Sequence, residues 1–155
     1  MAAQPHVIID GFNVVFGVQN LGDLFRISPD AAKAELIKLA QATHDGDGSQ
    51  VTLVFDGKGK RLQVEHPFRD EQFTVVHAPS HISADGVIER MLSRARFPDR
   101  MTVVSNDHMI RDAAIASGAG VQSVNSWMEQ SSKSTRLRPP RRDEAGHGFG
   151  SRIPL

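Results

Sequence analysis

The stretches Val7-Ile8-Ile9-Asp10-Gly11 and Val51-Thr52-Leu53-Val54-Phe55-Asp56-Gly57 decide the fold of this chain. Each is a short run of mainly β-branched and other apolar residues that ends in Asp-Gly, a pattern typical of a buried strand followed by a tight turn. Further strands are predicted at 73–76, 101–104 and 121–124. Because these runs are apolar at consecutive positions, we expect both faces of the sheet to be covered.

Helical patterns alternate with these strands. Residues 29–43 repeat apolar side chains at helical spacing, with Ser28 at the N-cap position and Pro29 at the first helical position. Residues 84–95 and 109–116 show the same spacing. The alternation predicts an α/β fold, in which a mostly parallel central sheet of four to five strands lies between two layers of helices. The carboxyl ends of parallel strands share one edge of such a sheet, where ligands bind.

The composition excludes several classes of protein. The chain has 155 residues, 39% of them hydrophobic and 23% charged, so we expect one globular domain with a sizeable core. It has no cysteine, which excludes disulfides and thiolate metal sites. No apolar run reaches the length of a membrane span, and the first residues lack the features of a secretory signal. We therefore expect a cytoplasmic protein with no membrane partner.

The charge distribution divides the chain into two regions. Residues 133–155 contain six of the 18 Lys and Arg residues and two of the 18 Asp and Glu residues, so the formal charge is −4 before residue 133 and +4 from there on. Residues 131–155 are rich in Ser, Pro, Arg and Gly, which is typical of disorder. We expect a folded domain over 1–130, ending in a short helix at 126–130, and a basic, disordered tail over 131–155 that either binds RNA or only aids solubility.

Acidic residues recur where the predicted strands end. Asp10, Asp56 and Asp107 each follow a strand, and Asp85 lies in the first turn of the helix after another, with Glu89 on the same helical face. Two such charges ~4 Å apart repel each other by about 1 kcal/mol in bulk water and by several times more near a protein surface. A divalent cation relieves this repulsion, and oxygen ligands suit Mg²⁺ or Mn²⁺. Such an ion activates water beside a phosphodiester, which is the chemistry of a metal-dependent nuclease.

Each acid also has an ordinary structural explanation. An Asp-Gly pair after a strand is a common turn, and Asp107 suits a helix cap. Glu89, beside Arg90, suits a solvated surface. The explanations weaken when the acids are taken together, because a fold does not gather unpaired carboxylates for stability.

Three motifs resemble those of the NYN domain family. Ile8-Ile9-Asp10-Gly11-Phe12-Asn13-Val14 resembles the Asp-Gly-Tyr-Asn-Val/Ile opening of these domains, with Phe in place of Tyr. Ser83-Ala84-Asp85-Gly86-Val87-Ile88-Glu89 is similar to their Thr/Ser-Ala-Asp-x-x-Ile-Glu segment. Val104-Ser105-Asn106-Asp107-His108-Met109-Ile110-Arg111-Asp112 is similar to the Ser-Asn/Asp-Asp block of PIN-like nucleases. Their order and spacing most resemble the YacP-like branch, small bacterial endoribonucleases that include ribosome-associated members.

The resemblance covers about residues 5–128 and implies a PIN-like three-layer fold. By matching position, it implies that Asp10, Asp85 and Asp107 bind Mg²⁺ or Mn²⁺ and that Asn13 positions the first motif or contacts the phosphate. Weaker candidates for an outer shell or a second metal ion are Glu89, Asp56 and Asp112.

Basic residues near the same edge are candidates for RNA binding. Lys58, Lys60 and Arg61 follow the second predicted strand, in a segment (58–70) expected to be a loop or an irregular hairpin. They either contact RNA phosphates or lie in a solvated loop. Trp127 is expected to pack in the core rather than to stack on a base.

The sequence thus predicts an endoribonuclease that hydrolyses RNA phosphodiesters through a carboxylate-bound Mg²⁺ or Mn²⁺, with messenger RNA and the ribosome as the partners that the resemblance implies. An alternative from another class stays open: a non-catalytic RNA- or ribosome-binding module on the same fold. A phosphohydrolase of the haloacid-dehalogenase type is discounted, because Phe12 stands where its second Asp is needed. Dinucleotide binding is discounted too, since no Gly-x-Gly-x-x-Gly loop follows the first strand.

Overall fold

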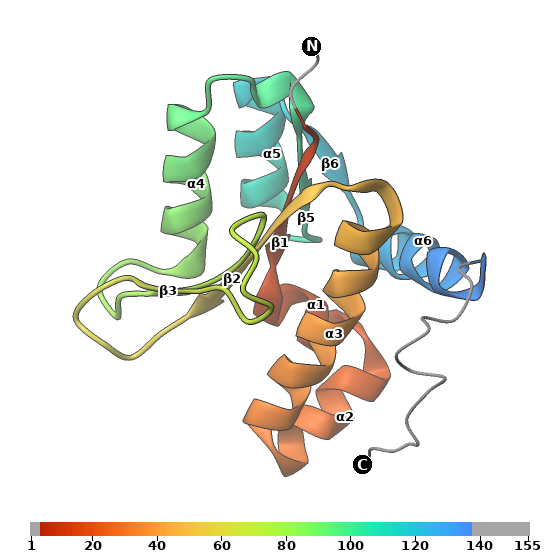
Figure 1. Ribbon diagram of the computed structural model, residues 1–155. Helices are drawn as coiled ribbons and strands as arrows, with labels where there is room; N and C mark the ends of the chain where they lie inside the picture. The colour runs from red at the N-terminus through yellow and green to blue at the C-terminus, as the bar shows by residue number, and fades with distance from the viewer. Residues whose placement is uncertain (1–3, 138–155) are drawn as a thin grey trace.

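The computed structural model describes residues 4–137 and shows a six-stranded sheet between two layers of helices (Figure 1). The elements in chain order are β1 (His6–Asp10), α1 (Gly11–Gly17), α2 (Gln19–Ile27), α3 (Pro29–Asp47), β2 (Gln50–Asp56), β3 (Gln63–Glu65), β4 (Phe73–Ala78), α4 (Ala84–Arg94), the 3₁₀ turn η1 (Pro98–Arg100), β5 (Met101–Val104), α5 (His108–Ser117), β6 (Gly120–Gln122) and α6 (Val124–Leu137).

The order of the strands brings three motifs to one edge of the sheet. The order is β3-β4-β2-β1-β5-β6, and every neighbouring pair is parallel except β3 with β4. The chain adds β2 and β4 on one side of β1 and then crosses to add β5 and β6 on the other side. The order therefore reverses beside β1, which is the position where doubly wound sheets bind ligands.

The predicted α/β fold is confirmed, and the sheet is wider than the four to five strands expected. The additional strand is β3, which pairs antiparallel with β4 through Val64 and Val76. All three residues of β3 are exposed, so it lacks the apolar run that marks the other strands. The segment expected to be a loop or an irregular hairpin therefore contributes an edge strand.

Adjacent residues of the central strands point to opposite faces of the sheet. Ile9, Leu53 and Phe55 pack in the core formed with α1, α2, α3 and α6, whereas Ile8 and Val54 pack in the core formed with α4 and α5. All five side chains are fully buried. Figure 1 shows α4 and α5 together on one side of the sheet and α3 on the other. This two-sided burial explains why the strands are apolar at consecutive positions.

The helix α1 replaces the tight turn that the sequence predicts after Asp10, and α2 was not expected either. The segment of α1 contains two glycines and two valines, which are poor helix formers. Burial of Val14 and Val15 stabilises it instead. Gly11 is required by close packing rather than by a turn, because a Cβ at this position would overlap the ring of Phe55. The ends of β1 and β2 can therefore approach each other closely.

The helix α6 belongs to the folded domain. The boundary expected at residue 130 falls inside this helix, which continues to Leu137. Trp127 is only 2% exposed, and its Nε1–H donates a hydrogen bond of 3.0 Å to Thr43 Oγ1 on α3. This burial agrees with the packing role expected for Trp127. Residues 138–155 of the expected tail lie outside the described residues.

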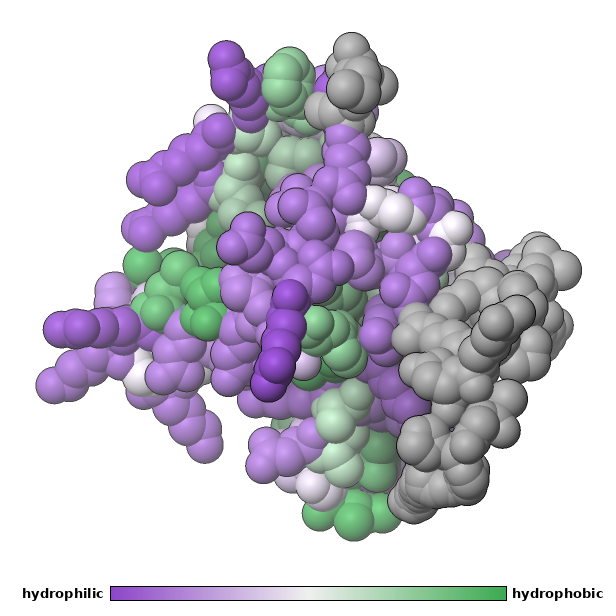
Figure 2. Space-filling view, in the orientation of Figure 1, coloured by the Kyte–Doolittle hydropathy of each residue, from purple (hydrophilic) through white to green (hydrophobic). Residues whose placement is uncertain are grey.

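The face of the molecule in Figure 2 is largely hydrophilic, with separate smaller hydrophobic areas. Among residues 4–137, no helix combines the length and the apolar character needed to cross a lipid bilayer.

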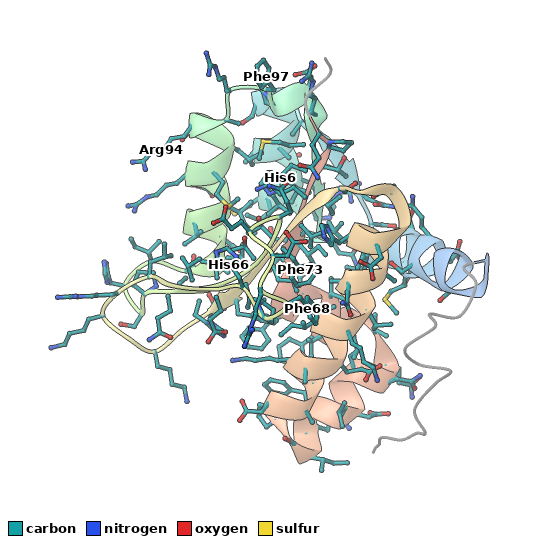
Figure 3. All side chains as sticks on the ribbon, viewed as in Figure 1. His6, His66, Phe68, Phe73, Arg94 and Phe97 are labelled. Atoms are coloured by element: carbon teal, nitrogen blue, oxygen red, sulfur yellow. The ribbon has the colours of Figure 1, made fainter. Side chains whose placement is uncertain are left out.

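The segment between β3 and β4 is attached to the end of α3. His44 Nε2 lies 2.8 Å from Asp70 Oδ2, and His44 Nδ1 lies 2.7 Å from the carbonyl oxygen of Ser49. The ring of Phe68 packs edge-on against Phe73, with centroids 5.0 Å apart, beside α3 (Figure 3). Burial alone would lower the pKa of His44, but the two hydrogen bonds and the charge of Asp70 outweigh burial and raise it.

The raised pKa of His44 predicts how stability depends on pH. Because His44 binds its proton more tightly in the folded state, protonation stabilises the fold at pH values below the ordinary pKa of His. This stabilisation is lost as the pH rises through the higher pKa that His44 has in the folded state. The lowered pKa values of His6 and His77 act in the opposite direction, so the test compares the wild type with Asp70→Asn, which removes the partner charge. Between pH 6 and pH 8, we expect the midpoint of thermal unfolding of Asp70→Asn to rise relative to that of the wild type. If the midpoint of thermal unfolding changed equally with pH in the two proteins, this assignment would be contradicted.

Candidate functional site

A cavity of about 450 Å³ opens at the carboxyl edge of the sheet. Four acidic residues from separate parts of the chain line it: Asp10 at the end of β1, Asp56 at the end of β2, Asp85 in the first turn of α4, and Asp107 directly before α5. The other lining residues are Phe12, Asn13, Phe16, Gly17 and Asn106. The fold therefore brings together the three acids proposed as metal ligands, the Asn of the first motif and one of the weaker candidates.

Asp10 is the most buried of the four acids. The residue is 6% exposed, and its Oδ2 accepts a hydrogen bond of 3.0 Å from the hydroxyl of Ser105, which is fully buried. Burial raises the pKa of Asp10 to about 6, and the charges of Asp85, Asp107 and Asp56 act in the same direction, against the hydrogen bond from Ser105. The negative form of this carboxyl group is thus disfavoured by its surroundings.

Ser105 joins the ends of β1 and β5. Besides donating to Asp10, its Oγ accepts a hydrogen bond of 3.0 Å from the backbone N–H of Asp107. Asp107 in turn caps α5, because its Oδ1 accepts from the backbone N–H groups of Met109 and Ile110. The capping role that the sequence offered as an ordinary explanation is real, and Asp107 nevertheless lines the cavity.

Asp56 holds the start of α4 in place. Its Oδ1 accepts a hydrogen bond of 2.7 Å from the backbone N–H of Ala84, the residue before Asp85. Burial raises the pKa of Asp85, and the charges of Asp107, Asp56 and Glu89 raise it further. Asp56 on β2 thus positions Asp85 on α4 close enough to the other acids for their charges to affect it.

Asn13 and Asn106 connect three elements around the cavity. Asn13 Oδ1 accepts a hydrogen bond of 2.7 Å from the backbone N–H of Asn106. Asn106 Oδ1 accepts one of 3.0 Å from the backbone N–H of Val124, at the start of α6. This chain of amides fixes α1 and α6 to the loop after β5. Asn106 and Ser105 were given no role from the sequence, although both stand in the third motif.

No cationic side chain of the described residues neutralises the four acids. Among residues 4–132, Asp23 pairs with Arg26 and Asp70 with His44, and none of the four cavity acids forms an ion pair. Arg111 lies near the cavity, but its guanidinium donates to the carbonyl oxygen of Ser105. Over the same residues, no three acidic or histidine side chains already form a compact metal-binding cluster. The site is an open acidic cavity rather than a closed cage.

The remaining acidic candidates lie outside this cavity. Glu89 is exposed on α4, and its charge reaches Asp85. Asp112 is exposed on α5 and does not line the cavity.

The basic candidates divide between two positions. Lys58 and Arg61 line a second cavity of about 630 Å³ that shares Phe12 and Asp56 with the acidic one. Lys60 is exposed and does not line either of these two cavities.

Removing the charge of Asp10 is expected to stabilise the fold in a buffer that contains a chelator. The folded state holds the Asp10 proton up to about pH 6 and the unfolded chain releases it near 3.8, so this group reduces stability as the pH rises between these values. At pH 7 Asp10→Asn should unfold with a free energy higher by up to roughly 3 kcal/mol, since the amide oxygen still accepts from Ser105.

Urea unfolding at pH 4 and pH 7 measures this effect. The exposed Asp99→Asn, on η1, serves as the control and should behave like the wild type. An Asp10→Asn variant that is less stable than the wild type at pH 7 would show that the carboxylate is not under electrostatic strain.

Comparisons with known structures agree with this architecture. The crystal structure of Rae1 (YacP) from Bacillus subtilis superimposes with a TM-score of 0.69 at 22% identity, covering 84% of this chain and 75% of that one. A single-substitution mutant of the same protein gives a TM-score of 0.71 at 20% identity, covering 86% and 78%. At these identities the likeness shows the fold. Among curated proteins, no significant sequence match was found.

The family is shown by the sequence itself. The family model for the YacP-like NYN domain matches residues 7–140. That span contains all four cavity acids and the whole of the described sheet after its first residue. We conclude that this chain belongs to the family of YacP-like NYN domains.

Proposed function

We propose that this protein is an endoribonuclease that hydrolyses phosphodiester bonds of RNA with the help of Mg²⁺ or Mn²⁺ held by Asp10, Asp85 and Asp107. The observation that carries the proposal is the convergence of these carboxylates, with Asp56, on one cavity in which no Lys or Arg of the described residues pairs with them. Membership of the YacP-like NYN family supports the same reaction class.

The residues present suit a divalent cation. The cavity offers several carboxylate oxygens, and hard cations such as Mg²⁺ and Mn²⁺ prefer oxygen ligands. Burial and mutual repulsion raise the pKa of both Asp10 and Asp85. A cation bound there would remove that penalty, lower the charge that opposes an incoming phosphate, and supply Lewis acidity to the water and the phosphate oxygens.

The side chains of this chain supply the positioning. Ser105 holds the Asp10 carboxylate through Oδ2 and fixes the backbone of Asp107, so the two acids keep one relative arrangement. Asp56 fixes the start of α4 and with it Asp85. Asn13 acts as a positioning residue, because its amide oxygen holds the loop that follows β5. Glu89, one turn after Asp85, adds negative charge from outside the cavity, and exposed Asp112 is left out of the proposed set.

Cleavage of RNA tests the reaction directly. The full chain should cut a single-stranded RNA in the presence of Mn²⁺ or Mg²⁺ and leave a 5′-phosphate and a 3′-hydroxyl. Asp10→Asn should lose at least about 100-fold in rate, because removing one group that stabilises the charge of the transition state typically costs this much. Asp99→Asn, an exposed charge outside the cavity, is the matched control. Absence of cleavage with either ion, or equal rates for Asp10→Asn and the wild type, would exclude the proposal.

Cation binding can be measured without turnover. Because a ligand that binds only the folded state raises its stability, saturating Mn²⁺ at a hundredfold excess over its Kd should stabilise the wild type by about 2.7 kcal/mol. Asp10→Asn should show little of this effect, whereas Asp99→Asn should keep it. A midpoint of thermal unfolding that Mn²⁺ and Mg²⁺ leave unchanged in the wild type would argue against the metal site even if RNA were cleaved.

The alternative, a non-catalytic RNA- or ribosome-binding module, gives a different result in the same experiments. It requires RNA affinity without turnover and no effect of Asp10→Asn on function. Association with the ribosome, which the family resemblance implies, stays a prediction.

A further inference from the structure

The second cavity adjoins the acidic one and has a different chemical character. It holds about 630 Å³, within the range of sites that take small organic ligands. Phe12 and Asp56 line both cavities, so the two adjoin at the carboxyl edge of the sheet. Its further lining residues include Phe25, Lys33 and Arg61. Of these three, Arg61 was predicted from the sequence to contact RNA phosphates, whereas Phe25 and Lys33 were given no role there.

Aromatic side chains form one side of this cavity. The rings of Phe12 and Phe25 meet edge to face, with centroids 5.7 Å apart, and Phe12 also packs against Phe55 at 5.1 Å. Phe12 and Phe25 are half-buried, so part of each ring faces the cavity that they line. Partly exposed rings of this kind offer a surface on which a flat, unpaired base can stack, whatever its identity.

Cationic side chains supply the complementary chemistry. The Lys33 ammonium lies 5.5 Å from the ring centroid of Phe12 and 5.4 Å from that of Phe55, which places its charge over the aromatic side. Lys58 and Arg61 line the same cavity and are exposed. Among the side chains of residues 4–132, none forms an ion pair with these three cations. They exceed in number the two acids of the cavity, Asp30 and Asp56.

The carboxylates of the acidic cavity do not attract RNA by themselves. Four carboxylates repel a phosphodiester, so they contribute nothing to RNA affinity by themselves. Affinity for a nucleic-acid backbone comes mainly from Lys and Arg at the phosphates and, for single strands, from stacking of bases on aromatic rings. Both kinds of group occur together in the adjoining cavity. Burial and the nearby Lys33 charge lower the pKa of His77, another lining residue, so its ring is neutral at pH 7 and adds no charge.

We propose that this second cavity is a subsite for one nucleotide of single-stranded RNA next to the bond that is cleaved, with the base against Phe12 and Phe25 and a phosphate at Lys33, Lys58 and Arg61. The inference rests on the proposed function for the identity of the ligand. A nucleotide in this subsite must have its base unpaired, so the substrate class is single-stranded RNA and duplex RNA is excluded. The subsite sets where the strand lies relative to the acids.

Binding measurements on the full chain test the base and the phosphate separately. All proteins carry Asp10→Asn to prevent cleavage, and fluorescence anisotropy reports binding of labelled oligoadenylate or of an abasic oligomer of the same length and charge. Oligoadenylate should bind about tenfold tighter than the abasic oligomer, as expected for a stacked base. Phe25→Leu, which keeps an apolar side chain, should remove most of that difference.

Arg61→Ala tests the contact with the phosphate. Because Arg61 is exposed, we expect the substitution to leave the fold intact. It should weaken the binding of both oligomers by a similar factor. It should also reduce the slope of log Kd against log salt concentration by about 0.7, the value for one phosphate contact on a single strand. Lys38→Gln, an exposed cation on α3 that does not line the cavity, is the matched control and should change neither quantity.

The outcomes separate the subsite from the reaction. Equal binding of the two oligomers, together with an Arg61→Ala variant indistinguishable from Lys38→Gln, would overturn the subsite, even if the protein with native Asp10 cleaves RNA. Base- and Arg61-dependent binding without cleavage under Mn²⁺ or Mg²⁺ would establish the subsite and refute the nuclease. Duplex RNA that binds as tightly as oligoadenylate would also overturn the subsite.

Discussion

The buried hydroxyl of Ser105 is the interaction on which the site depends. It donates to Asp10 at the end of β1 and accepts from the backbone of Asp107 after β5, so it joins the two strands between which the strand order reverses. It also offers Asp10 a hydrogen bond that partly offsets the cost of burying a carboxyl group among other acids. Without it, Asp10 would lack its hydrogen-bond donor, and the loop carrying Asp107 would lose its link to β1. The geometry of the acids therefore follows from the packing of the sheet.

Much of the fold could be predicted because strands that are buried on both faces are apolar at consecutive positions of the sequence. The parallel strands are apolar runs, and the ends of α3 and α5 are marked by Ser28 at the N-cap and Gly118 in the left-handed conformation. The helix α1 could not be predicted in the same way, because its residues favour other conformations and its stability comes from contacts with β2 and α3. The strand β3 was not predicted because it is exposed and pairs only at the edge of the sheet, so it has no apolar run.

The positions of the site acids could be predicted because parallel topology places strand ends together. Locating the strands was enough to predict the positions of Asp10, Asp56 and Asp107. Locating the start of a helix was enough to predict the position of Asp85. The groups that orient them were harder to find. Ser105 has no distinctive spacing, and its role depends on which strand lies beside β1. Lys33 stands in an amphipathic helix among other charged residues, and only the fold of α3 over Phe12 and Phe55 shows why it differs from Lys38.

The two adjoining cavities divide the recognition of a polyanion between opposite charges. If cations stood among the four acids they would neutralise them, and the site would have no remaining attraction for a divalent ion. If the acids stood alone they would repel the strand. Lys33, Lys58 and Arg61 line the adjoining cavity and not the acidic one, which satisfies both requirements, and Phe12 and Asp56 are the lining residues that the two cavities share. Phe at this position, where the family motif has Tyr, adds no hydroxyl to the wall of either cavity and packs against Phe25 and Phe55.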